Sequence, residues 1–268
     1  MAILLSSRRD LLRAGGYAVA AVIVGSAASA EGTVVRDDLF AVFEREGFPG
    51  TLVVYDVAAD RLTGIGAARA ARRYVPASTF KIPNSLIALE TGVVKDAGEV
   101  FRYDGKPRPV KAWEKDMTLR EAMAASNVPV YQEIARRIGL ARYRDWMARL
   151  DYGNRQLGTI VDQFWLDGPL EISAVEQARF LASFGAGRLP VSERSRGVVR
   201  DIVRIEEKAG RALFAKTGWS GKIGWWAGWV EQGSRITSFA LNMDMTRLED
   251  APKRIAIGKE LLARLGVY

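Results

Sequence analysis

The pattern of apolar and polar positions places strands near both ends of the chain and helices between them. A β-branched, apolar run predicts a strand over residues 50–56, and Asp60-Arg61 can turn it into a second strand through Ile65. Three more strands are predicted near the C-terminus, over 212–216, 225–230 and 236–242. We expect strands from both ends to join in one antiparallel sheet, with the helical middle as an insertion.

Capping signals mark where several helices begin. Thr118 with Glu121, and Ser173 with Glu176, have the spacing of a capping box. Asp250 can cap a final helix in which apolar residues repeat at helical spacing. Other helices are predicted over 37–46, from near Ser78 to Glu90, over 130–138, around 143–150 and from Ser192, with an irregular connection over 93–113.

Pro129 marks a corner in the helical middle, because a proline disfavours helical conformation in the residue before it, here Val128. One helix should therefore stop near this point and another should follow. The fold class that results is α+β: an antiparallel sheet flanked by helices, with a mostly helical second lobe. A cleft is expected where the two lobes meet.

The first thirty residues have the composition of an export signal. Arg8-Arg9 lies in a twin-arginine pattern, an apolar run follows over 14–27, and Ala28-Ser29-Ala30 fits a cleavage site. A short membrane anchor is the alternative, but spanning a bilayer takes about 20 apolar residues. We therefore expect residues 1–30 to be a signal peptide of the twin-arginine type. Residues 31–268 would then form one exported, periplasmic domain without a membrane anchor.

Two missing residue types narrow the possible chemistry. The chain of 268 residues has no cysteine, which excludes disulfides, thiolate metal sites and cysteine nucleophiles. It has no histidine either, which excludes a Ser-His-Asp triad and histidine-bound metals. A lysine or a carboxylate must therefore act as any general base, and we expect no metal.

The net charge of +8 is scattered along the chain. Residues 1–30 hold three arginines and one aspartate, so +6 remains without them. Arginine pairs such as Arg72-Arg73 stand among acidic residues, and no block of five or six like charges occurs. This pattern predicts a solvated surface and no nucleic-acid partner.

The stretch from Pro76 to Glu90 carries the candidate nucleophile. Ser78 and Lys81 are three residues apart, so on a helix their side chains share one face. A helix N-terminus also presents unpaired backbone N–H groups to a developing oxyanion. The plain alternative for this short motif is a capping serine followed by a solvated lysine. The absence of histidine raises the weight of Ser78 as nucleophile and Lys81 as base.

Three further short motifs can line the cleft, and each also has a structural explanation, as does a fourth motif at Tyr152. Lys216-Thr217-Gly218 puts a cation at the end of a strand, or is only a strand before a glycine turn. Ser126 offers a hydroxyl at the helical corner, or only ends a helix. Trp165 offers an indole N–H, or is a core aromatic. Tyr152-Gly153-Asn154 has the composition of a surface turn.

Together, in this order and spacing, the motifs resemble those of the class D serine β-lactamases, the oxacillinase family. The motifs are Ser78-Thr79-Phe80-Lys81, Ser126-x-Val128, Tyr152-Gly153-Asn154, Phe164-Trp165-Leu166 and Lys216-Thr217-Gly218. The segments 225–231 and 250–254 fit the same pattern, and the resemblance covers residues from about Phe48 to Leu261. It implies a β-lactamase/transpeptidase-like fold and hydrolysis of penicillin-type antibiotics, giving resistance. Ser126-Asn127-Val128 departs from the Ser-Asp-Asn of class A enzymes.

The resemblance also implies a role for each residue. Ser78 would be acylated, and Lys81 would be the general base as an N-carboxylated lysine that takes up carbon dioxide or bicarbonate. Trp165 would donate its N–H to that carboxylate. Ser126 and Lys216 would pass a proton to the lactam nitrogen. The substrate would be bound by Val128, Leu166, Thr217, Gly218, Trp219 and Arg254.

Three alternatives share parts of this motif set. A penicillin-binding sensor would be acylated without turnover, a D-alanyl-D-alanine peptidase is expected to have Ser-x-Asn where this chain has Ser126-x-Val128, and a binding module could keep the fold without activity. The sequence does not determine which β-lactams are hydrolysed, the response to inhibitors, or whether the protein is a monomer or a homodimer.

Overall fold

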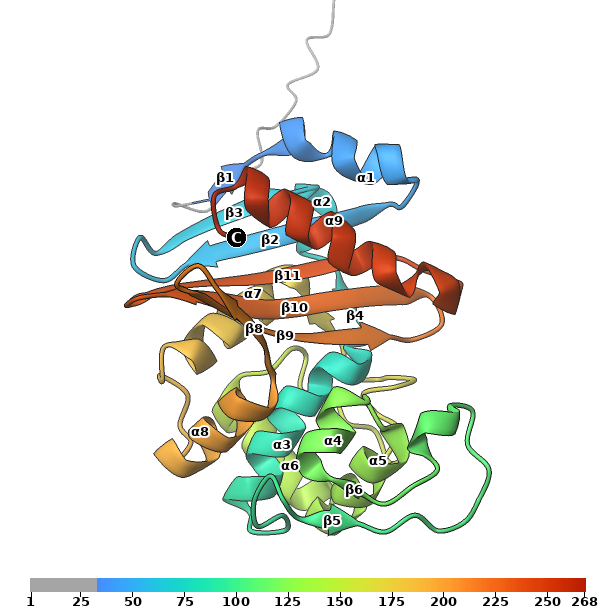
Figure 1. Cartoon of the computed structure of the whole chain (residues 1–268). Coiled ribbons are helices and arrows are strands. Elements are labelled where there is room, and N and C mark those ends of the chain that lie inside the picture. Colours follow the sequence, from blue (N-terminus) through green and yellow to red (C-terminus); the bar gives the residue numbers. More distant parts are fainter. Residues whose placement is uncertain (1–32) are drawn as a thin grey trace, which may run out of the picture. The chain divides into compact units, whose positions relative to one another are not determined.

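A seven-stranded sheet is the centre of the computed structural model, which describes residues 33–268 (Figure 1). The predicted signal peptide lies outside the described residues. The strand order is β1-β3-β2-β11-β10-β9-β8, so strands from both ends of the chain are neighbours, as predicted. The strands are β1 (Thr33–Val35), β2 (Gly50–Asp56), β3 (Arg61–Ile65), β8 (Arg204–Lys208), β9 (Arg211–Trp219), β10 (Ile223–Gln232) and β11 (Arg235–Asp244).

The sheet differs from the prediction at both edges. β1 pairs in parallel with β3, with Thr33 opposite Leu62, so the sheet is mixed rather than wholly antiparallel. β8 was not predicted, because none of its five residues is buried and the strand has no apolar alternation. Between these edges every pairing is antiparallel, from β3-β2 through β11 and β10 to β9.

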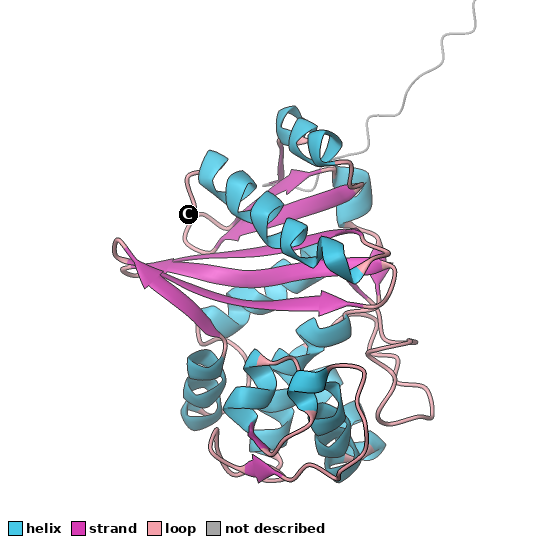
Figure 2. Ribbon diagram, turned by 45° about the vertical axis from the view of Figure 1, so that its right-hand side comes forward, coloured by secondary structure: helices cyan, strands magenta, loops and turns pink. Residues whose placement is uncertain are grey.

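Helices cover both faces of the sheet (Figures 1 and 2). They are α1 (Ala41–Glu46), α2 (Ala67–Ala70), α3 (Lys81–Glu90), α4 (Leu119–Ala124), α5 (Val128–Ile138), α6 (Leu140–Leu150), α7 (Ala174–Gly185), α8 (Glu193–Ile202) and α9 (Ala251–Arg264). Two small antiparallel sheets pair β4 (Arg73–Tyr74) with β7 (Ile172–Ser173) and β5 (Val100–Phe101) with β6 (Met117–Thr118). Within the described residues, no helix is long and apolar enough to cross a membrane.

Two apolar cores follow from the alternation of side chains along the strands. Leu52 and Val54 of β2 point to the core beneath α1 and α9. Val53 and Tyr55 point to the larger core, which includes α7 and the helical lobe of α3 to α6. The helical lobe is thus continuous with one face of the sheet, and the site lies along this junction.

Several helix boundaries correct the sequence predictions. The segment over 37–46 is a 3-10 turn followed by the short α1 rather than one helix. The predicted helix start near Ser78 is a 3-10 turn, Ala77–Phe80, and the α-helix begins at Lys81. The capping boxes at Thr118 and Ser173 are both confirmed.

The remaining corrections concern Val128 and Asp250. Val128 is the first residue of α5, because the Asn127 side chain caps that helix and Pro129 is tolerated in its first turn. Asp250 precedes α9 but makes no side-chain cap. It already has helical φ and ψ at the end of a 3-10 turn, whereas a capping residue has non-helical φ and ψ.

Candidate active site

Ser78 lies in the 3-10 turn before α3, against the end of β9. Trp225 Nε1 of β10 donates a hydrogen bond of 3.0 Å to the Val75 carbonyl and so fixes the segment before the serine. Gly218 of β9 is equally close, since a Cβ there would lie 2.9 Å from Pro76 O and 3.3 Å from the Ser78 nitrogen. Only glycine allows this approach, which brings the strand end beside the Ser78 N–H.

Two residues without glycine's freedom adopt left-handed backbone at the site. Ala77, directly before Ser78, has φ of 49°, and Ser126 has φ of 52°. Such conformations are costly for residues with a Cβ and persist where the surrounding packing imposes them. One of these strained residues directly precedes the Ser78 hydroxyl, and the other, Ser126, carries the second hydroxyl of the site.

Lys81 is buried completely, and its Nζ is hydrogen-bonded to Ser78 Oγ at 2.9 Å. Burial, and secondarily the charge of Lys216, lower its pKa well below the usual range. None of the ion pairs in the described part of the chain includes Lys81. The Tyr131 ring centroid lies 4.9 Å from Nζ, and Tyr131 Oη bonds Ser85 Oγ at 2.8 Å. The amine is therefore held near the serine, and burial favours its neutral form.

An aromatic cluster encloses this lysine from the other side. Phe80, the residue before Lys81, stacks on Trp165 with a centroid distance of 5.6 Å and meets Phe164 edge-on at 5.2 Å. Trp165 is fully buried, and its Nε1 has no hydrogen-bond partner among the described residues. An unpaired buried donor is rare and calls for a chemical explanation.

Ser126 and Lys216 form a second hydroxyl–amine pair. Lys216 Nζ donates to Ser126 Oγ at 3.0 Å and to the Thr217 carbonyl at 3.1 Å. Burial, and secondarily the charge of Arg254, lower the pKa of Lys216 to about 7. The structure thus brings the predicted pairs Ser78–Lys81 and Ser126–Lys216 into direct contact within each pair.

Arg254 reaches the site from α9. Its guanidinium donates from one Nη to the Gly218 carbonyl at 3.0 Å, and burial lowers its pKa to about 10. Its Nε is buried without a partner among the described residues. Trp219 is turned back into the fold, since its Nε1 donates to the Met245 carbonyl at 2.8 Å. Thr217, Trp219, Val128 and Leu166 are all half-buried.

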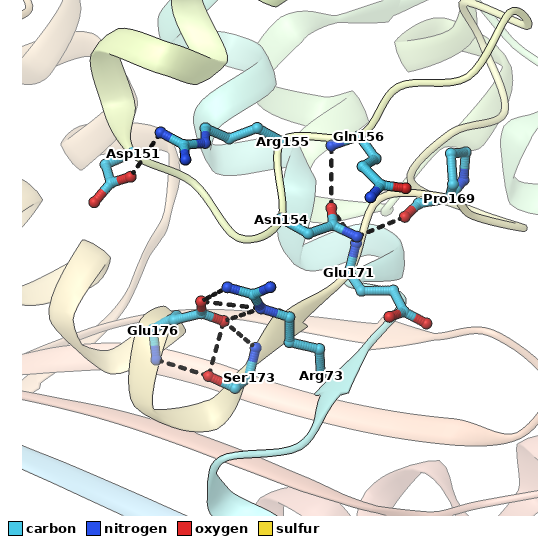
Figure 3. Close-up of polar contacts among 9 residues, drawn as sticks. All are labelled: Arg73, Asp151, Asn154, Arg155, Gln156, Pro169, Glu171, Ser173 and Glu176. Carbon is cyan, nitrogen blue, oxygen red and sulfur yellow. Dashed lines mark hydrogen bonds and ion pairs between the residues drawn. The ribbon is translucent and has the colours of Figure 1, made fainter.

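The Tyr152-Gly153-Asn154 motif is not a surface turn but an anchor for the loop that carries Trp165 (Figure 3). Asn154 Nδ2 donates to the Pro169 carbonyl at 2.9 Å, while its Oδ1 accepts from the Gln156 and Glu171 nitrogens, both at 3.1 Å. Tyr152 is fully buried, and its hydroxyl donates to Gln177 Oε1 at 2.9 Å. Both ends of the loop over 154–171 are thus tied together.

Figure 3 also shows Arg73 of β4 against Glu176 of α7. Arg73 Nε lies 3.0 Å from both Glu176 carboxylate oxygens. The same carboxylate accepts from the Ser173 nitrogen at 2.8 Å, so it closes the capping box as well. The contact joins the segment that leads to Ser78 to the segment that follows the loop.

Tyr131 was not among the residues predicted to form the site. Its ring lies beside Lys81 because α5 packs against α3, and no local motif marks it. The described residues contain no group of three or more acidic, histidine or cysteine side chains that could hold a metal ion.

Comparison with known proteins identifies the fold family of this site. Residues 53–263 match the family model of the penicillin-binding protein transpeptidase domain. β-Lactamase OXA-48 of Klebsiella pneumoniae is 48% identical over 198 residues, covering 72% of this chain and 75% of that protein. β-Lactamase OXA-5 of Pseudomonas aeruginosa is 41% identical over 232 residues, covering 84% and 87%.

Solved structures give the same result. The crystal structure of FUS-1 (OXA-85), a class D β-lactamase from Fusobacterium nucleatum subsp. polymorphum, superposes with a TM-score of 0.84 at 39% identity and covers 87% of this chain and 98% of that one. The fold is therefore that of the penicillin-recognising transpeptidase proteins. Within them, the chain belongs to the class D β-lactamases, which are serine hydrolases of cyclic amides.

Proposed function

We propose that this chain hydrolyses the β-lactam amide of penicillin-type antibiotics through an acyl-enzyme on Ser78, and so confers resistance. The observation that carries the proposal is the pair formed by Ser78 Oγ and the buried Lys81 Nζ, 2.9 Å apart. Ser78 Oγ attacks the lactam carbonyl carbon, the C–N bond breaks, and the nitrogen receives a proton. Water then cleaves the ester and releases the opened acid.

The surroundings of Lys81 favour carbon dioxide addition to its amine. A neutral amine can react in this way and an ammonium cannot, and burial lowers the pKa of Lys81. The N-carboxylated lysine would supply the general base for the Ser78 proton. Trp165 Nε1, buried without a partner among the described residues, is the donor suited to hold that group. No metal is part of the proposal.

Ser126 would carry the proton to the lactam nitrogen, and the hydrogen bond of 3.0 Å from Lys216 Nζ to its hydroxyl supports this role. The backbone N–H groups of Ser78 and Trp219 would bind the oxyanion. Lys216, Thr217 and Arg254 supply charge and hydrogen bonds for the ring carboxylate of the substrate. Gly218 allows the strand end to lie against the Ser78 segment, and the half-buried Val128 and Leu166 provide apolar surface.

The proposal includes export to the periplasm, which rests on the signal sequence in residues 1–30. It includes no nucleic-acid partner and leaves the choice between monomer and homodimer as a prediction. The alternative with a specific observation in its favour is a penicillin-binding sensor, since the same Ser78–Lys81 pair would serve acylation alone.

A nitrocefin assay at catalytic enzyme concentration tests the proposal. We expect sustained turnover that Ser78→Ala abolishes. Ser234→Ala is the matched control, because Ser234 is exposed in the turn between β10 and β11. A single stoichiometric burst would instead identify a sensor. No reaction, or turnover that survives Ser78→Ala, would overturn the proposal.

A further inference from the structure

A cavity lined by Asn127 and Pro129, next in sequence to Ser126 and Val128, plays no part in the mechanism above. Its volume is about 280 Å³, and its walls include Trp113, Asn127 and Val130. Trp113 Nε1 donates to the Ala125 carbonyl at 3.0 Å, so this wall is fastened to the residue before Ser126. Asn127, which lines the cavity, directly follows Ser126 in the chain.

The other walls carry more basic than acidic side chains. Five basic side chains line the cavity, against the two carboxylates of Asp104 and Glu133: Arg102, Lys106, Arg108, Lys115 and Arg136. Both carboxylates are already engaged, since Asp104 pairs with Arg108 at 2.6 Å and Glu133 pairs with Arg137. Lys115 is in no ion pair within residues 33–268. Arg102 pairs with Asp116, Arg136 pairs with Asp162, and Lys106 Nζ lies 3.9 Å from Asp104, so the positive charge left without a carboxylate partner in the described chain is that of Lys115.

Arg108 gives a second, independent sign of an anionic ligand. Its side chain is only 23% exposed, and its Nε is buried with no hydrogen-bond partner among the described residues. A buried guanidinium N–H normally has an acceptor. This unpaired donor belongs to a residue that lines the cavity.

The shape of a penicillin relates this cavity to the substrate. The ring carboxylate and the acylamino group stand at opposite ends of the bicyclic nucleus. If Thr217 and Arg254 bind the carboxylate, the acyl group lies at the far end of the nucleus. The position proposed for it is beside Val128, the residue that follows Asn127 of the cavity wall. A cavity of about 150 Å³ holds a benzene ring, so the volume of about 280 Å³ accommodates an aryl ring with a carboxylate.

We propose that this cation-lined cavity is a subsite for β-lactams whose acyl side chain carries an anionic group. The inference rests on the proposed function and deepens it by naming a substrate class. Lys106 and Lys115 supply the field at the rim, and Arg108 supplies the hydrogen-bond donor. Trp113 forms the apolar wall for the aryl ring.

Carbenicillin and benzylpenicillin make a matched pair, because they differ by one carboxylate on the acyl side chain. We expect Lys115→Gln to lower kcat/KM for carbenicillin by about two- to fivefold, the range for one exposed charge pair. Benzylpenicillin kinetics should stay unchanged. Lys106→Gln/Lys115→Gln should have the larger effect, and added NaCl should reduce the preference in the wild type. Lys208→Gln is the control, since it removes the same charge from an exposed position of β8.

Three results would overturn the subsite. The ratio of the two substrates could be unchanged in both variants, or Lys208→Gln could change it equally. Alternatively, sodium sulfate could inhibit both penicillins equally through Lys115, which would identify a site for free anions. If the wild type is acylated without turnover, the proposed hydrolysis fails, but the ratio of acylation rates by mass spectrometry still tests the subsite. If neither penicillin acylates Ser78, both proposals fail.

Discussion

Lys81 and Lys216 each lie at about the same distance from a serine hydroxyl, but they differ in the number of their other polar partners. Lys81 is enclosed by the helical lobe, against the Tyr131 ring, and among the described residues its one hydrogen-bond partner is Ser78. Lys216 stands at the end of β9, where Ser126 and the Thr217 carbonyl both accept its hydrogen bonds. Burial lowers the pKa of both amines, and each also experiences a neighbouring positive charge.

The difference shows how one residue type can serve two purposes in a site without histidine. An amine with no polar partner except the nucleophile is suited to covalent modification and base chemistry. An amine with two oxygen acceptors is suited to hold a proton relay in place and to attract an anion. The polar partners, more than the depth of burial, distinguish the two lysines.

Replacing each lysine in turn should distinguish the two roles, and these substitutions are expected to have the largest effect on activity. Lys81→Ala should reduce kcat by about a thousandfold or more, within the range for loss of a general base. Lys216→Ala should reduce kcat/KM by a smaller factor than Lys81→Ala does. Added bicarbonate should raise the activity of the wild type and of Lys216→Ala, and leave Lys81→Ala unchanged. Bicarbonate-independent kinetics, with no carbamate signal in carbon-13 NMR, would contradict the modified base.

Stability against pH provides a second comparison, measured without bicarbonate. A buried lysine with a lowered pKa binds fewer protons folded than unfolded, so folding stability falls as pH drops from 10.5 toward the folded pKa. For Lys216 that window runs from 10.5 down to about 7. Lys81→Met and Lys216→Met should therefore stabilise the fold at neutral pH, by about 1–4 kcal/mol.

Urea denaturation at several pH values checks this prediction. The gain over wild type should shrink to near zero as pH rises to 10.5, and Lys208→Met serves as the exposed control. A gain that is constant with pH would mean that shape, and not the buried amine, is responsible. Lys216→Met should also raise the pKa of Lys81, because the charge of Lys216 contributes to its lowering.

Trp165 is proposed to act on Lys81 and not on Lys216. Trp165→Ala should slow deacylation more than acylation, by about tenfold or more, because its N–H would no longer hold the base for the attacking water. Trp165→Phe removes the N–H and keeps a ring against Phe80. Stopped-flow acylation and burst kinetics separate the two steps. Equal slowing of both steps in both variants would reduce Trp165 to a packing residue.

Much of the fold could be predicted from local patterns. β2 has an apolar, β-branched run, the three C-terminal strands are rich in apolar residues, and the capping boxes at Thr118 and Ser173 are local in sequence. β8 lacks an apolar pattern because both its faces are exposed. The turn at Ala77 could not be predicted either, since its left-handed backbone is imposed by packing around it and is not an alanine preference.

In the site, too, the residues within local motifs could be predicted, and those brought in by packing could not. The motifs of Ser78, Lys81, Ser126 and Lys216 are short and ordered along the chain, and the family resemblance they carry is confirmed. Tyr131 is 50 positions from Lys81, so only the packing of α5 on α3 brings its ring there. The function of Asn154 as an anchor was also missed, because its partners include Pro169 and Glu171 at the far end of a loop.

Substitution of Asn154 is expected to have the smallest effect. Asn154 anchors the loop that carries Trp165 and makes no hydrogen bond with Lys81. Asn154→Ala removes three hydrogen bonds that tie the loop bearing Trp165, and should cost about 1–2 kcal/mol of unfolding free energy, since most of them are partly exposed. Deacylation should slow a few-fold, while the KM for benzylpenicillin, which depends on the Lys216 side, should stay the same. Asn154→Asp keeps both accepted bonds and loses only the one to Pro169, so its effect should be intermediate. If Asn154→Ala changes KM and leaves deacylation untouched, the loop supports the Ser126–Lys216 pair instead, and the separation of the two lysine environments is wrong.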